Sequence, residues 1–510
     1  MTANLNASYQ QAYQRLEERW KKISHLDHAT SMLDWDEATM MPNGSAGQRA
    51  EALAGLELMK HELVCAPEAQ QDLKASLDHR DKLTDWQSSN LLLMQRIIER
   101  SSLLPPRLVE ETSRVVSASQ MAWREHRKNN DFKNMAPHLE KVFQLKKEAA
   151  QILSQKKGRS PYECLMDIYE ANLSEAKVNQ LFESLRSFLP EFLKKVLKTQ
   201  NEIKTTKALG PFAVEKQQKI GRMIAEKIGF DFQRGRLDIS HHPFCGGTPQ
   251  DVRITTRYSP ENFLSSLFGV LHETGHAKYE QNLPLSWNPQ PVGRALGMMI
   301  HESQSLITEM QISKGAAFLK FLLPLLKSEF ETAADSPEAW SLENFIRSCS
   351  WVKPDFIRVD ADEVTYPLHI VLRYEIERDI INGSLRVDEI PSVWDEKMQK
   401  YLGVDTRQNY ESGCLQDIHW PAGLIGYFPC YTLGALTAAQ FFKALKAKHP
   451  QVDQELSQGE FKTINSWLKE NVYLKASLYP AEDLIVQVTG RPLDTSAFFN
   501  HLEERYLQTR

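Results

Sequence analysis

Two histidines flank a glutamate in the segment His272-Glu273-Thr274-Gly275-His276. Residues four apart project from the same side of an α-helix, so both imidazoles could bind one metal ion. Glu273 follows the first histidine and would act on water as a general base, later returning the proton to a leaving amine. The pattern therefore predicts metal-dependent hydrolysis of a peptide bond.

A third metal ligand is expected from a neighbouring element, because a catalytic zinc site takes three protein ligands and keeps one position open. His301 and Glu302 stand in the apolar segment 295–307. An acid in such a segment is costly unless it is paired or binds metal, so Glu302 is the predicted third ligand and His301 an outer neighbour. The alternatives are a buried salt bridge at Glu302 and ordinary core or surface histidines at 272 and 276.

Short motifs extend this pattern along most of the chain. They are Leu33-Asp34-Trp35-Asp36, His242-Pro243-Phe244, Asp251-Val252-Arg253-Ile254-Thr255, His301-Glu302-Ser303-Gln304-Ser305, Ile357-Arg358-Val359-Asp360-Ala361-Asp362 and Gly413-Cys414-Leu415-Gln416-Asp417-Ile418-His419-Trp420. In this order they resemble the carboxypeptidase Taq family of metallocarboxypeptidases. The resemblance implies a helical, cleft-containing and usually dimeric enzyme. It also implies broad removal of C-terminal amino acids, commonly sparing proline, with one zinc ion per chain that cobalt can replace.

Further catalytic candidates follow the last motif. In the resemblance, His419 falls where an imidazole would help to stabilise the tetrahedral oxyanion, although it could equally be a hydrogen-bonded core residue. Tyr427 and Tyr431 would by default pack a turn, but a phenol near the metal could donate to the same oxyanion. Of the two tyrosines, Tyr427 is the predicted donor.

Five residues are candidates for substrate binding. Arg358 could hold the terminal carboxylate of the substrate bidentately, or could instead pair with a nearby Asp360 or Asp362. The other four are His242, Asp251, Arg253 and Thr255. The last three alternate along a predicted strand and share one face, either as a polar ladder or as an edge strand that binds substrate.

The elements that must position these residues are mainly helices. Apolar residues recur at three and four places in residues 7–25, 84–101, 105–127, 135–157, 174–198 and 211–229. Ser259-Pro260-Glu261 predicts the start of the helix that carries the two histidines, ending near Gln281. The stretch 236–258 predicts a β-hairpin or small sheet beside it. We predict a mostly α fold, a single domain over residues 1–510 with a deep cleft between two lobes and no clear linker.

Composition limits the partners. The chain has 66 acidic and 61 basic residues and a formal charge of −5, too balanced to indicate nucleic acid. Its six cysteines form no paired motif, which favours reduced thiols. We find neither a signal peptide nor an apolar run of about 18 residues, so we predict a cytoplasmic protein that acts on peptides with a free C-terminus.

Three other functions compete with this prediction. An endopeptidase or oligopeptidase would use the same metal chemistry without capturing a terminal carboxylate, and Arg358 is the residue that separates the two. A binding protein with a structural zinc would need a fourth protein ligand, and none stands out. A helical scaffold without metal would lose nothing to chelators.

Overall fold

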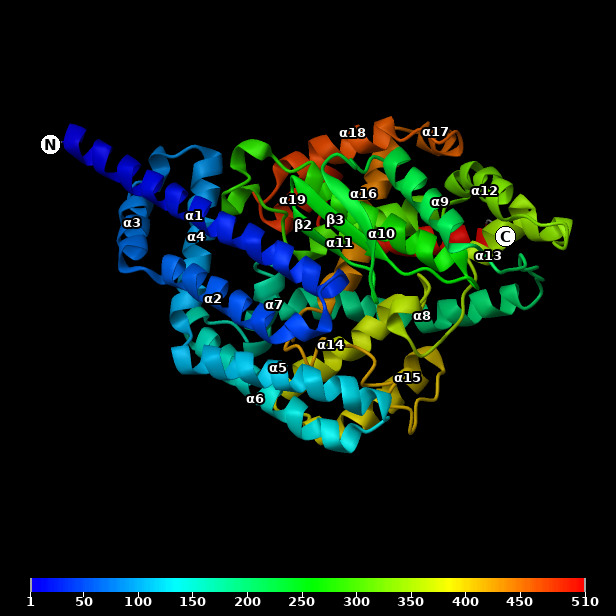
Figure 1. Cartoon of the computed structure of the whole chain (residues 1–510), viewed down its shortest axis with the longest axis horizontal. Coiled ribbons are helices and arrows are strands. Elements are labelled where there is room, and N and C mark those ends of the chain that lie inside the picture. Colours follow the sequence, from blue (N-terminus) through cyan, green and yellow to red (C-terminus); the bar gives the residue numbers. More distant parts are fainter. Residues whose placement is uncertain (1, 509–510) are drawn as a thin grey trace.

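The computed structural model describes residues 2–508, and its architecture is mostly α-helical, as predicted. Nine α-helices precede the only strands of this part of the chain: α1 (Thr2–Thr39), α2 (Ala46–Cys65), α3 (Pro67–Leu77), α4 (Asp85–Leu103), α5 (Pro106–Lys128), α6 (Phe132–Lys157), α7 (Pro161–Tyr169), α8 (Glu175–Gln200) and α9 (Val214–Lys227). Figure 1 shows α5 and α6 at the bottom of the molecule and the sheet above them.

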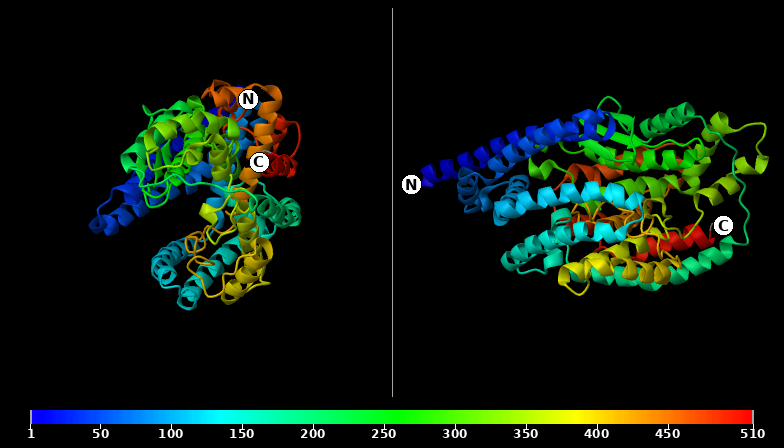
Figure 2. Two further views of the ribbon diagram at one scale, coloured as in Figure 1. Left: turned by 90° about the vertical axis from the view of Figure 1, so that its right-hand side faces the viewer. Right: turned by 60° about the horizontal axis from the view of Figure 1, so that its bottom comes forward.

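Eleven α-helices follow the strands within the described residues. They are α10 (Phe263–Gln281), α11 (Met298–Leu306), α12 (Ala316–Phe330), α13 (Leu342–Cys349), α14 (Tyr366–Asn382), α15 (Ile390–Leu402), α16 (Pro429–Lys448), α17 (Val452–Ser457), α18 (Lys462–Asn471), α19 (Ala481–Thr489) and α20 (Ser496–Glu503). A π-helix, Ile307–Ser313, continues α11. In the left view of Figure 2, the helices form an upper and a lower group that meet along one side.

Helix α8 illustrates why the apolar period gives buried helices. The Ser174 hydroxyl accepts a hydrogen bond from the backbone N–H of Lys177 at 3.2 Å, which caps the first turn. Val178, Leu181 and Leu185 then recur at three and four places and are almost completely buried. The predicted helix over residues 174–198 is confirmed.

Helices α2 and α3 were not predicted, and α1 is longer than predicted. Helix α2 has apolar residues scattered around its circumference and buries only Val64, while Leu58 and Met59 are 59% and 54% exposed. A helix without one continuous apolar face lacks the periodic signal that sequence analysis detects. Helix α1 also runs well past the predicted residue 25, so that Trp35 lies near its end and packs on Phe244.

The small sheet beside α10 has three strands, β1 (Gly235–Ile239), β2 (Cys245–Thr248) and β3 (Asp251–Thr256), in the order β1-β3-β2. Strand β3 pairs in parallel with β1 and antiparallel with β2. The small sheet is thus confirmed, but of the two alternatives for β3, the edge strand that binds substrate is wrong. Its backbone is paired on both sides, so no peptide can add to it.

The helix that carries the two histidines begins later than predicted. Asn262, not Ser259, caps α10, and its side chain accepts hydrogen bonds from Leu264 and Ser265 N–H. The reason is tertiary: the carbonyl of Ser259 accepts from Gln217, and the carbonyl of Pro260 accepts from the N–H of Phe212. The Ser259 carbonyl also accepts from the N–H of Asn262 at 3.3 Å, so residues 259–262 form a turn before the helix begins.

Two observations bear on the surroundings of the protein. All six cysteines carry free thiols, as predicted. Between residues 2 and 508, no helix is both long and apolar enough to span a bilayer.

Candidate metal centre

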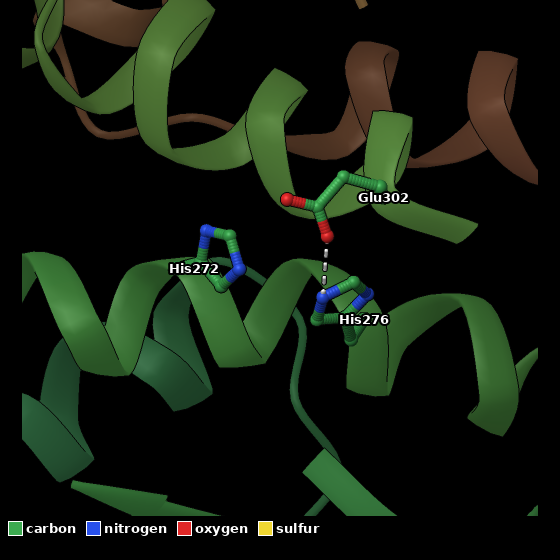
Figure 3. Close-up of side chains that lie close together, drawn as sticks. All are labelled: His272, His276 and Glu302. Carbon is green, nitrogen blue, oxygen red and sulfur yellow. Dashed lines mark ion pairs between the residues drawn. The ribbon is translucent and has the colours of Figure 1, made fainter. Parts of the chain in front are cut away.

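The three predicted metal ligands converge on one point. His272 and His276 project together from α10, and Glu302 faces them from α11 (Figure 3). Their ligand atoms all lie within 4.8 Å of one another, and His276 Nε2 is 3.3 Å from a Glu302 carboxylate oxygen. Two imidazoles and one carboxylate are a donor set that catalytic zinc sites use.

Two glycines allow the ligand helices to come this close. A Cβ atom on Gly275 would lie 2.4 Å from the carbonyl oxygen of Gln304 on α11. On the other side of α11, a Cβ on Gly434 of α16 would lie 2.8 Å from both Cβ and Cγ of Glu302. Helix α11 is therefore held between α10 and α16 at a spacing that only glycine permits.

Each ligand histidine has an outer hydrogen-bond partner. His272 Nδ1 lies 2.9 Å from a carboxylate oxygen of Glu309, in the π-helix. His276 Nδ1 lies 3.1 Å from the carbonyl oxygen of His301 and 2.7 Å from its Nδ1, and His301 Nε2 contacts Glu280 at 2.8 Å. Such partners fix the imidazole tautomer and leave Nε2 for the metal. His301 is thus an outer neighbour, as predicted.

Sequence analysis missed Glu309 and Glu280. Glu309 stands seven residues after Glu302, and residues seven apart lie on the same face of a helix. That spacing would have identified Glu309 as a second acid facing α10. Glu280, four residues after His276 on α10, carried the same signal.

The electrostatics of the cluster suit a cation and a base. Burial raises the pKa of Glu273 to about 7. Burial opposes the charge on Glu302, but a hydrogen bond with His276 and the nearby His272 lower its pKa below the usual range. Burial and neighbouring His301 lower the pKa of His276 to about 4, so this ring is neutral at pH 7 and its Nε2 lone pair is available.

Glu273 lies between the ligand histidines in sequence and is 6% exposed. Its carboxylate makes no hydrogen bond to any other protein group of residues 2–508, whereas most buried carboxylates do. An unpartnered buried carboxylate with a raised pKa is a candidate general base.

Arg358 is held by Asp417, and not by the Asp360 or Asp362 considered from the sequence. Arg358 Nε and Nη2 donate to Asp417 at 3.1 Å and 2.9 Å, while Arg373 contacts the second carboxylate oxygen at 2.7 Å. Asp417 thus occupies the Nε–Nη2 edge of the Arg358 guanidinium. No hydrogen bond from the described residues occupies Nη1, so the Nη1–Nη2 edge remains open.

His419 and the two tyrosines form one aromatic group beside Arg358. Burial lowers the pKa of His419 to about 3, and its Nε2 lies 3.0 Å from the Tyr431 hydroxyl. The Tyr431 ring centroid is 4.8 Å from the Arg358 guanidinium carbon. Among the described residues, the one hydrogen-bond partner of the Tyr427 hydroxyl is a sulfur, Met298 Sδ at 3.6 Å, and the Tyr427 ring lies 5.2 Å from that of Tyr431.

The four candidates on and before the sheet have structural partners. Asp251 and Arg253 pair with each other at 2.7 Å on the central strand. The Thr255 hydroxyl accepts from the N–H of Phe244 at 3.0 Å and so fixes the loop that contains His242. His242 itself is exposed and contacts the ring of His241 edge-on, and no hydrogen bond or ion pair within residues 2–508 joins it to the three metal-ligand candidates.

The same loop approaches α10, the helix that carries His272 and His276. A Cβ on Gly269, one turn before His272, would lie 3.6 Å from Pro243 Cγ. The loop over residues 241–244 therefore lies against the N-terminal half of α10.

Comparison with known proteins gives an extensive match. A model of the family described as carboxypeptidase Taq (M32) metallopeptidase matches residues 15–506. Thermostable carboxypeptidase 1 of Thermus thermophilus is 34% identical over 506 residues, covering 97% of this chain and 98% of that protein. Among solved structures, metallocarboxypeptidase 1 of Trypanosoma cruzi superimposes with a TM-score of 0.95 and 39% identity, covering 98% of this chain and 99% of the other. The M32 carboxypeptidase of Deinococcus radiodurans gives 0.91 and 30% with similar coverage (98% and 99%).

Proposed function

Because the chain belongs to the carboxypeptidase Taq (M32) metallopeptidase family, and is therefore a metallocarboxypeptidase, we propose that it releases C-terminal amino acids from peptides with broad specificity, commonly sparing proline. The observation that carries this proposal is the convergence of His272, His276 and Glu302 beside the unpartnered Glu273.

The proposed cofactor is one zinc ion per chain, which cobalt can replace. Two imidazole nitrogens and one carboxylate oxygen suit a borderline-soft divalent cation, and the outer contacts at Nδ1 of both histidines leave each Nε2 to face the ion. Although burial opposes its charge, carboxylates around His272, Glu309 among them, raise its pKa to about 10, so this ring would release a proton when the ion binds. When bound, the ion would lower the pKa of water towards about 7 and polarise the scissile carbonyl.

In the proposed reaction, a Glu273 carboxylate oxygen takes one proton from the attacking water. As the C–N bond breaks, Glu273 passes that proton to the amine that leaves. A pKa of about 7 suits both steps, because the same group must accept and release a proton near neutral pH.

Stabilisation of the oxyanion is proposed for Tyr427 and His419. A thioether is a weak acceptor, so the Tyr427 hydroxyl loses little when it turns from Met298 to a developing negative charge. Neutral His419 has one donor nitrogen, and its contact with Tyr431 connects the imidazole to a second phenol beside the site. Tyr431 is therefore a further candidate donor.

Recognition of the terminal carboxylate is proposed for Arg358. Its open Nη1–Nη2 edge can form two parallel hydrogen bonds to a carboxylate, while Asp417 fixes the direction of the guanidinium from the adjacent Nε–Nη2 edge. Asp251, Arg253 and Thr255 are proposed to support substrate binding indirectly, by stabilising the small sheet and the loop beside it. His242 is proposed to act from the loop that Thr255 holds.

The remaining proposals concern the whole molecule. We expect one domain with a substrate cleft between two lobes, and a homodimer, as the family resemblance implied. Light scattering at micromolar concentration tests the dimer, and a monomer would refute it.

Removal and return of the metal test the proposed function. Exhaustive chelation should abolish release of C-terminal amino acids, and one equivalent of zinc or cobalt should restore it. Full activity after chelation, with metal content verified as zero, would refute the proposed chemistry.

A further inference from the structure

The π-helix after α11 brings together two charged residues that an α-helix would separate. The backbone N–H of Lys314 donates to the carbonyl oxygen of Glu309 at 3.1 Å, five residues earlier, as in a π-turn. At 3.6 residues per turn, residues five apart point to nearly opposite sides. The wider π-turn instead places the Lys314 ammonium 2.8 Å from a Glu309 carboxylate oxygen.

This ion pair continues directly to the metal centre. One Glu309 oxygen contacts Lys314, and the other lies 2.9 Å from His272 Nδ1. Lys314 Nζ also lies 5.5 Å from the ring centroid of Phe268, which stands one turn before His272 on α10. The side chains of Lys314 and Glu309 are only 14% and 18% exposed, so solvent weakens their attraction less than at the surface.

The second ligand histidine has no such cation. His276 contacts His301, which in turn contacts Glu280, and no lysine or arginine of residues 2–508 forms an ion pair with Glu280. The two imidazoles are thus held by different means, and only His272 is linked to a buried lysine.

We propose that Lys314 is a positioning residue for the metal centre: through Glu309, it holds the His272 ring with Nε2 facing the ion and so slows loss of the metal. The π-turn is the feature that makes this possible. Without Lys314, the Glu309 carboxylate would have one fixed partner instead of two and could rotate away from His272. The inference rests on the proposed metal site.

The test is the affinity and dissociation rate of zinc, measured with a fluorescent chelator that competes with the protein. Glu309→Gln should weaken zinc binding about 10- to 100-fold, as loss of an outer partner typically does. Lys314→Met should weaken it several-fold and speed zinc release, whereas Lys314→Arg, which keeps the charge, should stay close to the parent.

Non-additivity gives the sharper result. If Lys314 acts through Glu309, the double variant should bind zinc no more weakly than Glu309→Gln alone. A multiplicative loss in the double variant, or unchanged zinc release in Lys314→Met, would overturn the inference. Glu375→Gln is the matched control, because Glu375 is also a buried acid paired with a lysine, Lys397 at 2.6 Å, but lies apart from the metal ligands.

Two controls separate failure to fold, failure of the proposed metal site and failure of the proposed role of Lys314. Thermal melts of the metal-free variants should match the metal-free parent, and a variant that does not fold is replaced by Lys314→Gln, which keeps a polar donor without the charge. A parent that binds no zinc would refute the proposed function, while a parent that binds zinc beside unaffected variants would refute only the role of Lys314.

Discussion

Replacing Arg358 by lysine should reduce cleavage of peptides with a free C-terminus while leaving metal content unchanged. An ammonium group is a single point charge and cannot form two parallel hydrogen bonds to a carboxylate. The measurement is kcat/KM for one peptide as the free acid and as the C-terminal amide, for parent and variant, with zinc content determined for both.

The size of the effect follows from the hydrogen bonds at stake. The Nη1–Nη2 edge of Arg358 is open in the structure, so the substrate carboxylate would gain two charge-assisted bonds there. Loss of one such bond costs about 1.5–3 kcal/mol. At about 1.4 kcal/mol per factor of ten, kcat/KM for the free acid should fall about 10- to 150-fold. The fold should persist, because Arg373 still contacts Asp417 at 2.7 Å.

The ratio between the two substrates separates recognition from structure. If Arg358 binds the terminal carboxylate, the parent should strongly prefer the free acid and the lysine variant should lose much of that preference. An equal drop for acid and amide, with the ratio kept, would show that Arg358 only supports Asp417. Arg253 or Arg257 would then be the next candidates for the carboxylate.

Four other results are expected. Glu273→Gln should retain zinc but lose nearly all turnover, because an amide accepts no proton from water, and near-normal turnover would remove Glu273 as the base. His276→Ala should strongly weaken zinc binding in equilibrium dialysis, and tight binding of one ion would point to another ligand set. Gly434→Ala should displace Glu302, because the new Cβ would lie 2.8 Å from its Cβ and Cγ, and should weaken zinc binding about tenfold. Unchanged zinc affinity would show that α16 can move away from α11 to make room for the methyl group. Lys278 is 3% exposed, and burial lowers its pKa from 10.5 to about 8. Because the folded pKa is depressed, the parent should gain stability as the pH rises from about 8 to 10.5. Lys278→Met should raise the free energy of unfolding at pH 7 by about 1–3 kcal/mol, measured by denaturant titration. The difference from the parent should shrink by pH 10, and a difference that stays constant with pH would contradict the lowered pKa of Lys278.

Sequence analysis predicted the metal-ligand helix and its partner well, because their chemistry is local. The spacing of His272 and His276 lies within one turn, and Glu302 stood out as an acid in an apolar segment. The structure brings all three within reach of one ion.

What sequence analysis missed depends on contacts between distant segments. The partner of Arg358 is Asp417, 59 residues later, rather than an acid within its own turn. The turn before α10 is held by Phe212 and Gln217, which donate hydrogen bonds to the carbonyls of Pro260 and Ser259. The central position of β3 depends on the parallel strand β1, which no hairpin signal includes.

The π-turn is a third kind of feature. Glu309 and Lys314 are five apart, a spacing that has no meaning in either an α-helix or a strand. Only the observed i to i+5 hydrogen bonding gives that spacing a structural role.

The most direct test of the central claim is the product pattern from two peptides of identical sequence, one with a free C-terminus and one amidated, incubated with the zinc-loaded protein. Mass spectrometry should show successive loss of single residues from the free end and no comparable cleavage of the amide. Efficient cutting of the amidated peptide, or products that begin inside the chain, would contradict the account.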